Sequence, residues 1–292
     1  MDSMLRAFAL AYALAFGLVI GSFVNVVAYR IPAGVSLLRE SRCPSCDAPI
    51  RAWQNVPVLS WLALRGRCAR CRARISWRYP VVELTTGVLF AALTWFLPWI
   101  ATTPSADDLV SLASLGPGDG WYASGAGVAV LFAFWWFAGS SVALTLIDLD
   151  TRRLPNAIVL PCYLVGAALL TTAGLLGADW SALFRAGIGM IALFGLYAAL
   201  WLVRPGAMGA GDVKLAGVVG LYLGWLGWGP LAVGVFSAFL LGGVFGITLL
   251  ASRRAGRKTA IAFGPWIILG AWTGVLAGTQ LAQLYLTLNG LT

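Results

Sequence analysis

The stretch LAGVVGLYLGWLGWGPLAVGVFSAFLLGGVFGITLLA, residues 215–251, runs for 37 residues without a charged side chain. As one straight helix it would be about 55 Å long, at roughly 1.5 Å per residue. The hydrocarbon core of a bilayer is only about 30 Å thick. We therefore expect this stretch to cross a membrane twice. Gly229-Pro230 is the expected point of reversal, because glycine and proline together interrupt a helix.

The composition of the whole chain supports the same class. Of its 292 residues, 60% are hydrophobic and 11% are charged, whereas a soluble domain has about 25% charged residues. The first apolar run is longer than the apolar core of a signal peptide, so we expect it to remain as a helix. The sequence predicts an all-α polytopic membrane protein in three parts: a first transmembrane helix (1–29), a soluble loop (30–80) and a transmembrane bundle (81–292). The eight expected spans are about 4–28, 81–101, 125–147, 155–177, 185–203, 214–229, 230–251 and 260–288.

The lysines and arginines predict the orientation of these spans. With eight spans, 18 of the 20 cations fall on one side, which by the positive-inside rule is the cytoplasm. Residues 30–80 and 252–259 are then cytoplasmic, while residues 102–124 and both termini lie outside. If residues 215–251 formed one span, the cationic cluster 253–258 would lie outside. We interpret the net charge of +9 as this orientation signal, which can also hold anionic lipid, and expect no nucleic-acid partner.

The cytoplasmic loop contains two C-x-x-C motifs, CPSC and CARC, about twenty residues apart. This spacing is typical of one tetrahedral zinc site with Cys43, Cys46, Cys68 and Cys71 as ligands. Two disulfides are the alternative, but thiols stay reduced in the cytoplasm. Four thiolates leave no open position for water, so the zinc is expected to be structural. The fifth cysteine, Cys162, lies inside a span and is expected to be a buried, inert thiol.

Two acids stand at the predicted inner membrane border, where ionisable residues are functional candidates. Asp148 ends the third span and Asp212 begins the sixth, so they share one membrane face although 64 residues separate them. Gly209 and Gly211 precede Asp212 and let backbone come close to another chain. The alternative is that border acids pair with Arg152, Arg153 and Lys214, and this is our interpretation of Asp150. Lys214 is expected to anchor its span to lipid head groups.

The chain contains no histidine, which excludes Ser-His-Asp and Cys-His nucleophilic sites. Two carboxyl groups remain as an acid–base pair. At about 4 Å, two like charges repel by roughly 4 kcal/mol at an effective dielectric constant of 20. One carboxyl group would therefore hold a proton and donate it, while its ionised partner deprotonates a water molecule.

Taken together, these motifs resemble the bacterial type IV prepilin peptidases, also called prepilin leader peptidase/N-methyltransferases. The resemblance covers about residues 17–215 in the family's order. Its motifs are GSFVNVVAYRIP (21–32), the paired C-x-x-C loop, NVPVLSWLALRGRC (55–68), ISWRYPVVEL (75–84), IDLD…LPN (147–156) and GAGDVK (209–214).

The resemblance implies a GxGD-type aspartic peptidase whose catalytic pair is Asp148 and Asp212. Such enzymes remove the leader of prepilins and pseudopilins after a glycine, next to the pilin's apolar helix, at the cytoplasmic side of the inner membrane. Members with the cysteine loop also methylate the new N-terminus with S-adenosylmethionine. For that reaction the loop around the Gly66 turn is the favoured region. Glu83 either binds the substrate amine or helps methyl transfer, or it forms a structural ion pair with Arg78.

Two other classes fit parts of this pattern. A proton- or ion-coupled transporter could use Asp148 and Asp212 as relay sites, but transporters usually place such acids near the middle of the membrane, between repeated halves. A zinc-loop adaptor without catalysis would need neither the GxGD motif nor the I-D-x-D motif. We therefore expect the peptidase.

Overall fold

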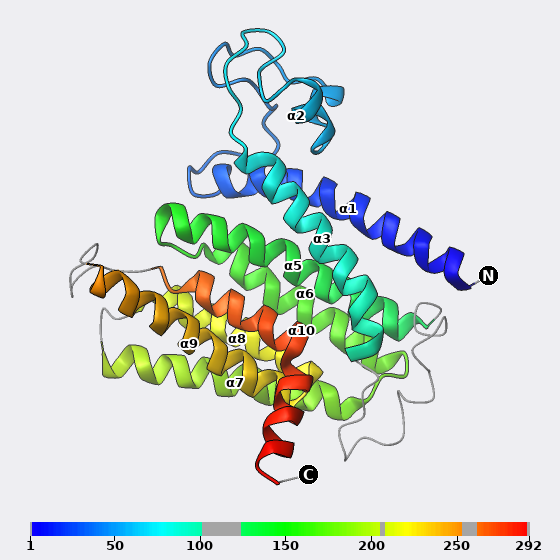
Figure 1. Ribbon diagram of the computed structural model, residues 1–292, viewed down its shortest axis with the longest axis vertical. Helices are drawn as coiled ribbons and strands as arrows, with labels where there is room; N and C mark the ends of the chain where they lie inside the picture. Colours follow the sequence, from blue (N-terminus) through cyan, green and yellow to red (C-terminus); the bar gives the residue numbers. More distant parts are fainter. Residues whose placement is uncertain (1, 101–123, 205–207, 253–261, 291–292) are drawn as a thin grey trace.

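The computed structural model describes residues 2–100, 124–204, 208–252 and 262–290. Within these ranges the chain is helical, and its β pairing is limited to two isolated bridges in the cysteine loop. The described ranges contain eight long helices, and Figure 1 shows a loop that projects beyond one end of α1 and α3. The long helices are α1 (Asp2–Arg30), α3 (Arg78–Ile100), α5 (Gly125–Thr151), α6 (Asn156–Leu175), α7 (Trp180–Val203), α8 (Ala210–Leu226), α9 (Trp228–Ala251) and α10 (Gly264–Leu288).

Seven of these helices are long and apolar enough to cross a membrane, which makes the chain a multi-pass membrane protein. The eighth, α8, has 17 residues, so it is only about 26 Å long. Thirteen of those residues are buried, and α8 contacts α6, α7, α9 and α10. The predicted sixth span is thus a short central helix that is shielded from lipid by its neighbours.

The reversal inside the 37-residue apolar stretch is present, but it lies at Gly227 rather than at Gly229-Pro230. Gly227 has φ 144° and ψ 171°, a conformation that is essentially restricted to glycine. Pro230 instead sits in the first turn of α9, where its missing N–H has no helical partner to lose. A second boundary also differs, because α5 extends to Thr151 and so includes Asp148 and Asp150 in its last turn.

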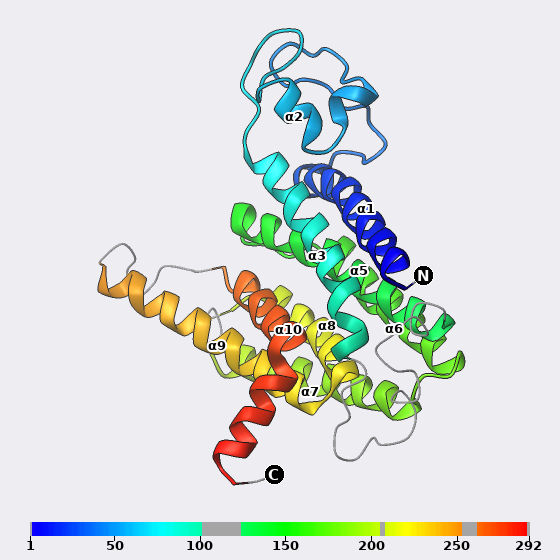
Figure 2. The same cartoon turned by 45° about the vertical axis from the view of Figure 1, so that its right-hand side comes forward.

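The long helices pack mainly as consecutive pairs: α1 with α3, α5 with α6, α7 with α8 and α9 with α10 (Figures 1 and 2). Glycines allow the close contact of α7 and α8, since a Cβ added to Gly189 would lie 2.6 Å from the carbonyl oxygen of Gly220. At the far end of α8, the Arg185 guanidinium donates to the carbonyl oxygens of Gly224 and Trp225. These contacts fix α8, and with it Asp212, within the bundle.

Candidate active site

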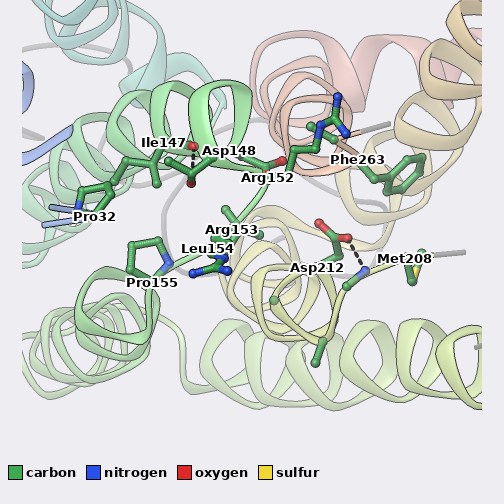
Figure 3. A pocket seen from close by; sticks show the side chains of 15 residues that line it. Pro32, Ile147, Asp148, Arg152, Arg153, Leu154, Pro155, Met208, Asp212 and Phe263 are labelled. Atoms are coloured by element: carbon green, nitrogen blue, oxygen red, sulfur yellow. Dashed lines mark hydrogen bonds between the residues drawn. The ribbon is translucent and has the colours of Figure 1, made fainter. Parts of the chain in front are cut away.

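A cavity of about 830 Å³ lies where the ends of several helices meet. Its walls come from the end of α5 and the segment that follows it, from the beginning of α8, from the residues just before α10, and from Pro32 after α1. Figure 3 shows Asp148 and Asp212 among the side chains that line it. The structure therefore brings together, in one cavity, the two acids that the sequence singled out.

Asp148 is held by the beginning of α10. Its side chain is 4% exposed, and one carboxylate oxygen accepts a hydrogen bond from the backbone N–H of Gly264 at 3.1 Å. Gly264 is the first residue of α10, where backbone N–H groups lack helical partners and the helix dipole favours negative charge. A Cβ on Gly264 would lie 2.6 Å from this carboxylate oxygen. A glycine is therefore required for the contact.

Asp212 is held in the same manner by its own helix. It is 7% exposed, and its carboxylate accepts the backbone N–H of Gly209 at 2.9 Å, while its own N–H donates to the Gly209 carbonyl at 3.0 Å. Gly211 has a different role from the one expected, because a Cβ there would lie 2.9 Å from the Cβ of Leu154. Its missing side chain admits Leu154, so α8 can approach the segment after α5.

Asp148 and Asp212 are both buried, and both line this cavity. In the described part of the chain, the ion pairs involve other acids. The alternative, in which border acids pair with Arg152, Arg153 and Lys214, is therefore not found for Asp148 and Asp212 in this part of the chain. Each carboxylate instead leans on one helix N-terminus, and both face the same cavity. The structure thus leaves both acids without a cationic partner at one cavity, within the described residues.

Asp150 does form an ion pair, but its partner is Arg78. Two guanidinium nitrogens of Arg78 lie 3.0 and 2.6 Å from the two Asp150 oxygens. The expectation that Arg152 or Arg153 would be the partner was wrong. So was the alternative that Arg78 pairs with Glu83. The contact ties the first residue of α3 to the last turn of α5, next to Asp148.

Glu83 and Lys214 do not line the cavity. Glu83 is buried, and its carboxylate accepts the backbone N–H of Val58 at 2.7 Å, so it joins α3 to the cysteine loop. The Lys214 ammonium group donates to the side-chain oxygen of Asn156 at 3.0 Å. Lys214 thus has a partner at the beginning of α6, and its anchoring to lipid head groups stays a prediction.

The four loop cysteines form one cluster. Their sulfur atoms all lie within 4.8 Å of one another, and those of Cys43 and Cys71 are 3.8 Å apart. A disulfide requires about 2.05 Å, whereas zinc–sulfur bonds of about 2.3 Å in a tetrahedron place the sulfurs about 3.8 Å apart. The cluster is therefore compatible with zinc, and all four cysteines are free thiols in the structure.

Each pair of cysteines sits in a turn of the same design. The N–H of Cys43 donates to the carbonyl of Ala48, and that of Cys68 donates to Ala73. Asp47 and Arg72, each directly after a second cysteine, have φ of 54° and 61°. The backbone N–H groups of Cys71 and Arg70 lower the pKa of the Cys68 thiol to about 6, which favours the thiolate that binds metal.

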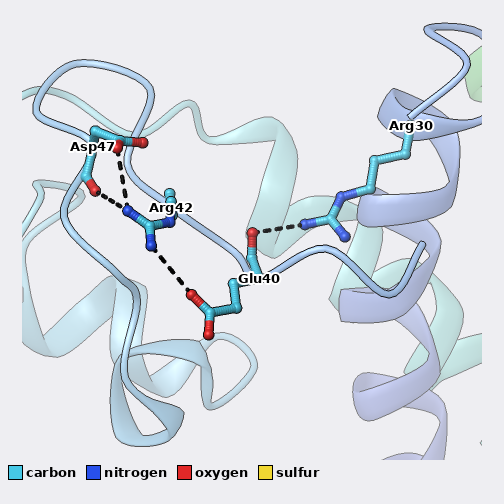
Figure 4. A network of polar contacts seen from close by, with 4 residues as sticks. All are labelled: Arg30, Glu40, Arg42 and Asp47. Atoms are coloured by element: carbon cyan, nitrogen blue, oxygen red, sulfur yellow. Dashed lines mark hydrogen bonds and ion pairs between the residues drawn. The ribbon is translucent and has the colours of Figure 1, made fainter. Parts of the chain in front are cut away.

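Arg30 attaches the loop to α1. Its buried guanidinium donates to the carbonyl oxygens of Leu37 and Glu40 at 2.9 and 3.4 Å. Arg42 then bridges Glu40 and Asp47, at 3.3 and 3.2 Å (Figure 4).

Gly66 has φ 63°, and a Cβ there would lie 2.9 Å from the Trp61 ring. The turn expected at Gly66 is confirmed.

Comparison with known proteins shows the family. Residues 15–97 match the bacterial peptidase A24 N-terminal domain, and residues 135–247 match the type IV leader peptidase family. Proteins named prepilin leader peptidase/N-methyltransferase from Stutzerimonas stutzeri and Aeromonas hydrophila are 34% and 35% identical to this chain. These alignments cover 94% and 93% of the chain and 92% of each relative. The chain belongs to the type IV leader peptidase family.

A further relative of the same name, from Neisseria gonorrhoeae, is 33% identical over 92% of the chain and 91% of its own length. No solved structure matches. The type IV leader peptidase region, 135–247, contains both Asp148 and Asp212, and the N-terminal region contains the four cysteines and Glu83. The family supports the peptidase interpretation over the transporter.

Gly264 lies outside both matched regions and was not expected as a site residue. The only signal in the sequence is Gly264-Pro265 at the beginning of the last apolar stretch, because proline is favoured in the first turn of a helix. That pattern predicts where a helix begins. It does not predict that the first N–H of this helix donates to Asp148.

Proposed function

We propose that this protein removes the leader of prepilins and pseudopilins by aspartic catalysis and then N-methylates the new N-terminus. Cleavage takes place after a glycine at the cytoplasmic face of the bacterial inner membrane. The observation that carries the proposal is the placement of Asp148 and Asp212, from helices far apart in sequence, on one cavity. The names of the relatives supply the substrate class and the second reaction.

The two carboxyl groups divide the proton transfers between them. The ionised group accepts a proton from a water molecule as its oxygen attacks the carbonyl carbon of the scissile peptide bond. The protonated group donates its proton to the carbonyl oxygen, so that the tetrahedral intermediate is neutral. As this intermediate collapses and the C–N bond breaks, the carboxyl group that took the proton from water gives it to the leaving amine, and the other carboxylate takes a proton from one hydroxyl group, which restores the starting state. Neither carboxyl group alone performs both transfers.

The backbone around the cavity suits a peptide substrate. Gly209 and Ala210 lie in one wall, and their missing or small side chains let a second backbone approach. A helical segment must unwind before its carbonyl groups can be attacked, since each is otherwise hydrogen-bonded within the helix. The N-terminal ends of α8 and α10 lie at this cavity. Backbone N–H groups at a helix N-terminus lack helical partners, so they suit the carbonyl groups of an unwound substrate.

The cysteine cluster is proposed to hold a structural zinc ion through Cys43, Cys46, Cys68 and Cys71, which when bound cross-links the two turns. The loop so fixed is the proposed region of methyl transfer from S-adenosylmethionine. Glu83 supports its attachment, because it binds the loop backbone at Val58. We propose that the loop is cytoplasmic and that both termini are periplasmic, as the distribution of cations requires.

Purified protein, a prepilin and S-adenosylmethionine provide the test, with the N-terminal mass of the product as readout. The wild-type enzyme should remove the leader and add one methyl group. Asp148→Asn and Asp212→Asn should each reduce cleavage by about 10²-fold or more, the contribution expected of a positioned acid or base. Asp150→Asn is the matched control and should retain substantial activity, because Asp150 faces Arg78.

The mutants must still insert into the membrane, keep their zinc and bind prepilin. Normal cleavage by the Asp212→Asn protein would remove the aspartic mechanism. Cleavage without an added methyl group would leave the peptidase intact and refute the transferase.

A further inference from the structure

A second cavity, of about 550 Å³, lies between α1, α5 and α6. We call it the apolar groove. No charged side chain lines it, and the only hydroxyl group is that of Ser140. Trp135 and Trp136 also line it, and the indole N–H of Trp135 already donates to the Phe90 carbonyl at 3.1 Å, which leaves that of Trp136 as the other indole donor. The groove therefore offers an occupant apolar contact and almost no hydrogen bonds, which suits an apolar segment inside a membrane.

The dimensions of the apolar groove fit a helix. Along α1 and the residue after it the lining runs from Phe16 to Ile31, and along α6 from Ala157 to Leu169. At about 1.5 Å per residue these walls are roughly 22 and 18 Å long, or three to four helical turns. The walls on both sides are themselves helices, so a further helix can lie between them.

The apolar groove lies next to the cavity that holds the two aspartates, because sequence neighbours in three segments line one or the other. Three segments pass from one to the other. Ile31 lines the groove and Pro32 the aspartate cavity; Ala143 lines the groove and Ile147, one turn later, the cavity; Ala157 lines the groove and Pro155 the cavity. A peptide with its scissile bond at Asp148 and Asp212 would therefore have the groove directly beside it.

The side chains change in size along the groove. Close to the aspartate cavity α5 contributes Gly139, Ser140 and Ala143, and further away it contributes Phe132, Trp135 and Trp136. Small residues let the backbone of a second helix approach within a membrane, whereas the aromatic end offers wide apolar surface. The side chains of α5 are therefore smallest, and the groove has most room, where a substrate helix would begin.

We propose that the apolar groove binds the apolar helix of the substrate that follows the scissile bond, while the leader remains on the aqueous side. This inference rests on the proposed peptidase function. It makes the groove a specificity site: a substrate is recognised by a membrane-inserted helix of several turns directly after the bond. The position next to the aspartate cavity favours a peptide over a lipid chain. A peptide substrate has a scissile bond that must reach the two carboxyl groups, whereas a lipid has no such group.

Neighbouring positions on α6 provide a matched test. Val165 is half-buried and lines the groove, whereas Leu164 is 72% exposed and does not. Val165→Trp should fill the groove and Leu164→Trp should not. Two substrates are compared: a full-length prepilin in lipid vesicles, and a water-soluble peptide that ends a few residues beyond the scissile bond.

Val165→Trp should lower kcat/KM for the full-length prepilin about tenfold or more, the scale on which a misfitted apolar pocket discriminates. It should leave kcat/KM for the short peptide within about twofold, and Leu164→Trp should be within about twofold on both substrates. Equal and unchanged cleavage of full-length prepilin by Val165→Trp would overturn the proposal. A wild-type protein that cuts neither substrate would instead refute the peptidase function itself.

A second measurement does not depend on how a tryptophan is tolerated. A photoreactive benzoylphenylalanine replaces Phe23, which is 49% exposed and lines the groove, or Val19, which is 56% exposed and does not. Irradiation with prepilin should cross-link position 23, and not position 19, to the apolar segment after the scissile bond. Cross-links from position 23 to lipid alone would identify a lipid site and overturn the proposal.

Discussion

At the scale of single residues, the site depends on two hydrogen bonds that backbone N–H groups donate. Gly264 donates to Asp148 and Gly209 donates to Asp212. A backbone donor cannot be deleted by changing a side chain, but it can be displaced. Each contact leaves the other oxygen of its carboxyl group available for water or substrate. The positions of Gly264 and Gly209 therefore decide where the two acids point.

Gly264→Ala should disturb this arrangement without removing either acid. The new Cβ would lie 2.6 Å from the Asp148 oxygen, so Asp148 or the beginning of α10 must move. A misplacement of about 1 Å can cost up to 10²-fold in rate, and we expect kcat to fall by about tenfold or more on both full-length and short substrates. The measurement is the cleavage rate at saturating substrate.

Gly243→Ala is the matched control, because nothing lies within 4 Å of a Cβ at this helical glycine. It should cleave like the wild-type protein. If Gly264→Ala were fully active while inserted normally, the contact with Gly264 would not be positioning Asp148.

Asp148 and Asp212 could be identified from the sequence as candidate site residues, because acids are costly at a membrane border. Gly264 could not be identified in this way. The hydrogen bond spans 116 residues, and a backbone N–H has no residue type that identifies it. The partner of Asp150 was missed for a related reason, since Arg152 and Arg153 are close in sequence but Arg78 is close in space.

At the scale of elements, the two cysteine turns repeat one structure 25 residues apart. Each turn is too small to be stable alone, and a shared metal ion would hold the two together. The loop is joined to the bundle through Arg30, Glu83 and the Arg78–Asp150 ion pair. Loss of the metal should therefore affect the loop first and the aspartate cavity second.

Purified protein should contain about one zinc ion per chain, as expected for a four-thiolate site. Cys71→Ser should lower the zinc content, abolish methylation and weaken cleavage, while the spans remain inserted. Cys162→Ser is the matched control, because the Cys162 thiol is buried in α6 and donates a hydrogen bond to the Ile158 carbonyl oxygen. It should keep its zinc. Metal-free protein with full activity in both reactions would refute a structural role for zinc.

Elements with a strong local pattern were predicted well, and their boundaries less well. The apolar stretch 215–251 had to fold back, because its length exceeds the thickness of a membrane. The reversal lies at Gly227, however, since the chain needs a positive φ there and can keep Pro230 inside the first turn of α9. Dihedral angles of this kind are not encoded in hydropathy.

At the scale of the whole molecule, the ends of α1, α5, α6, α8 and α10 that should face the cytoplasm come together around one cavity. This convergence tests the number of spans. If residues 215–251 formed a single span, the beginning of α10 would lie on the opposite face from Asp148, yet Gly264 donates to Asp148. Which helices pack together was not predictable, because eight apolar helices have similar hydropathy and few distinguishing polar contacts.

The remaining question at this scale is which face is cytoplasmic, and the cations predict the answer. The eight-span topology predicts that 18 of the 20 lysines and arginines lie on one side, and cytoplasmic loops carry such an excess. A single cysteine introduced at Ser252, at the end of α9, should be spared by a reagent that cannot cross the inner membrane. One introduced at Ser114, outside the described residues, should be labelled in intact cells. The unmodified chain is the blank, since its loop cysteines are expected inside and Cys162 is buried. Labelling at position 252 but not at position 114 would show that the protein has the opposite orientation in the membrane. The aspartate cavity would then face the periplasm, away from the cytoplasmic leader that it is proposed to remove.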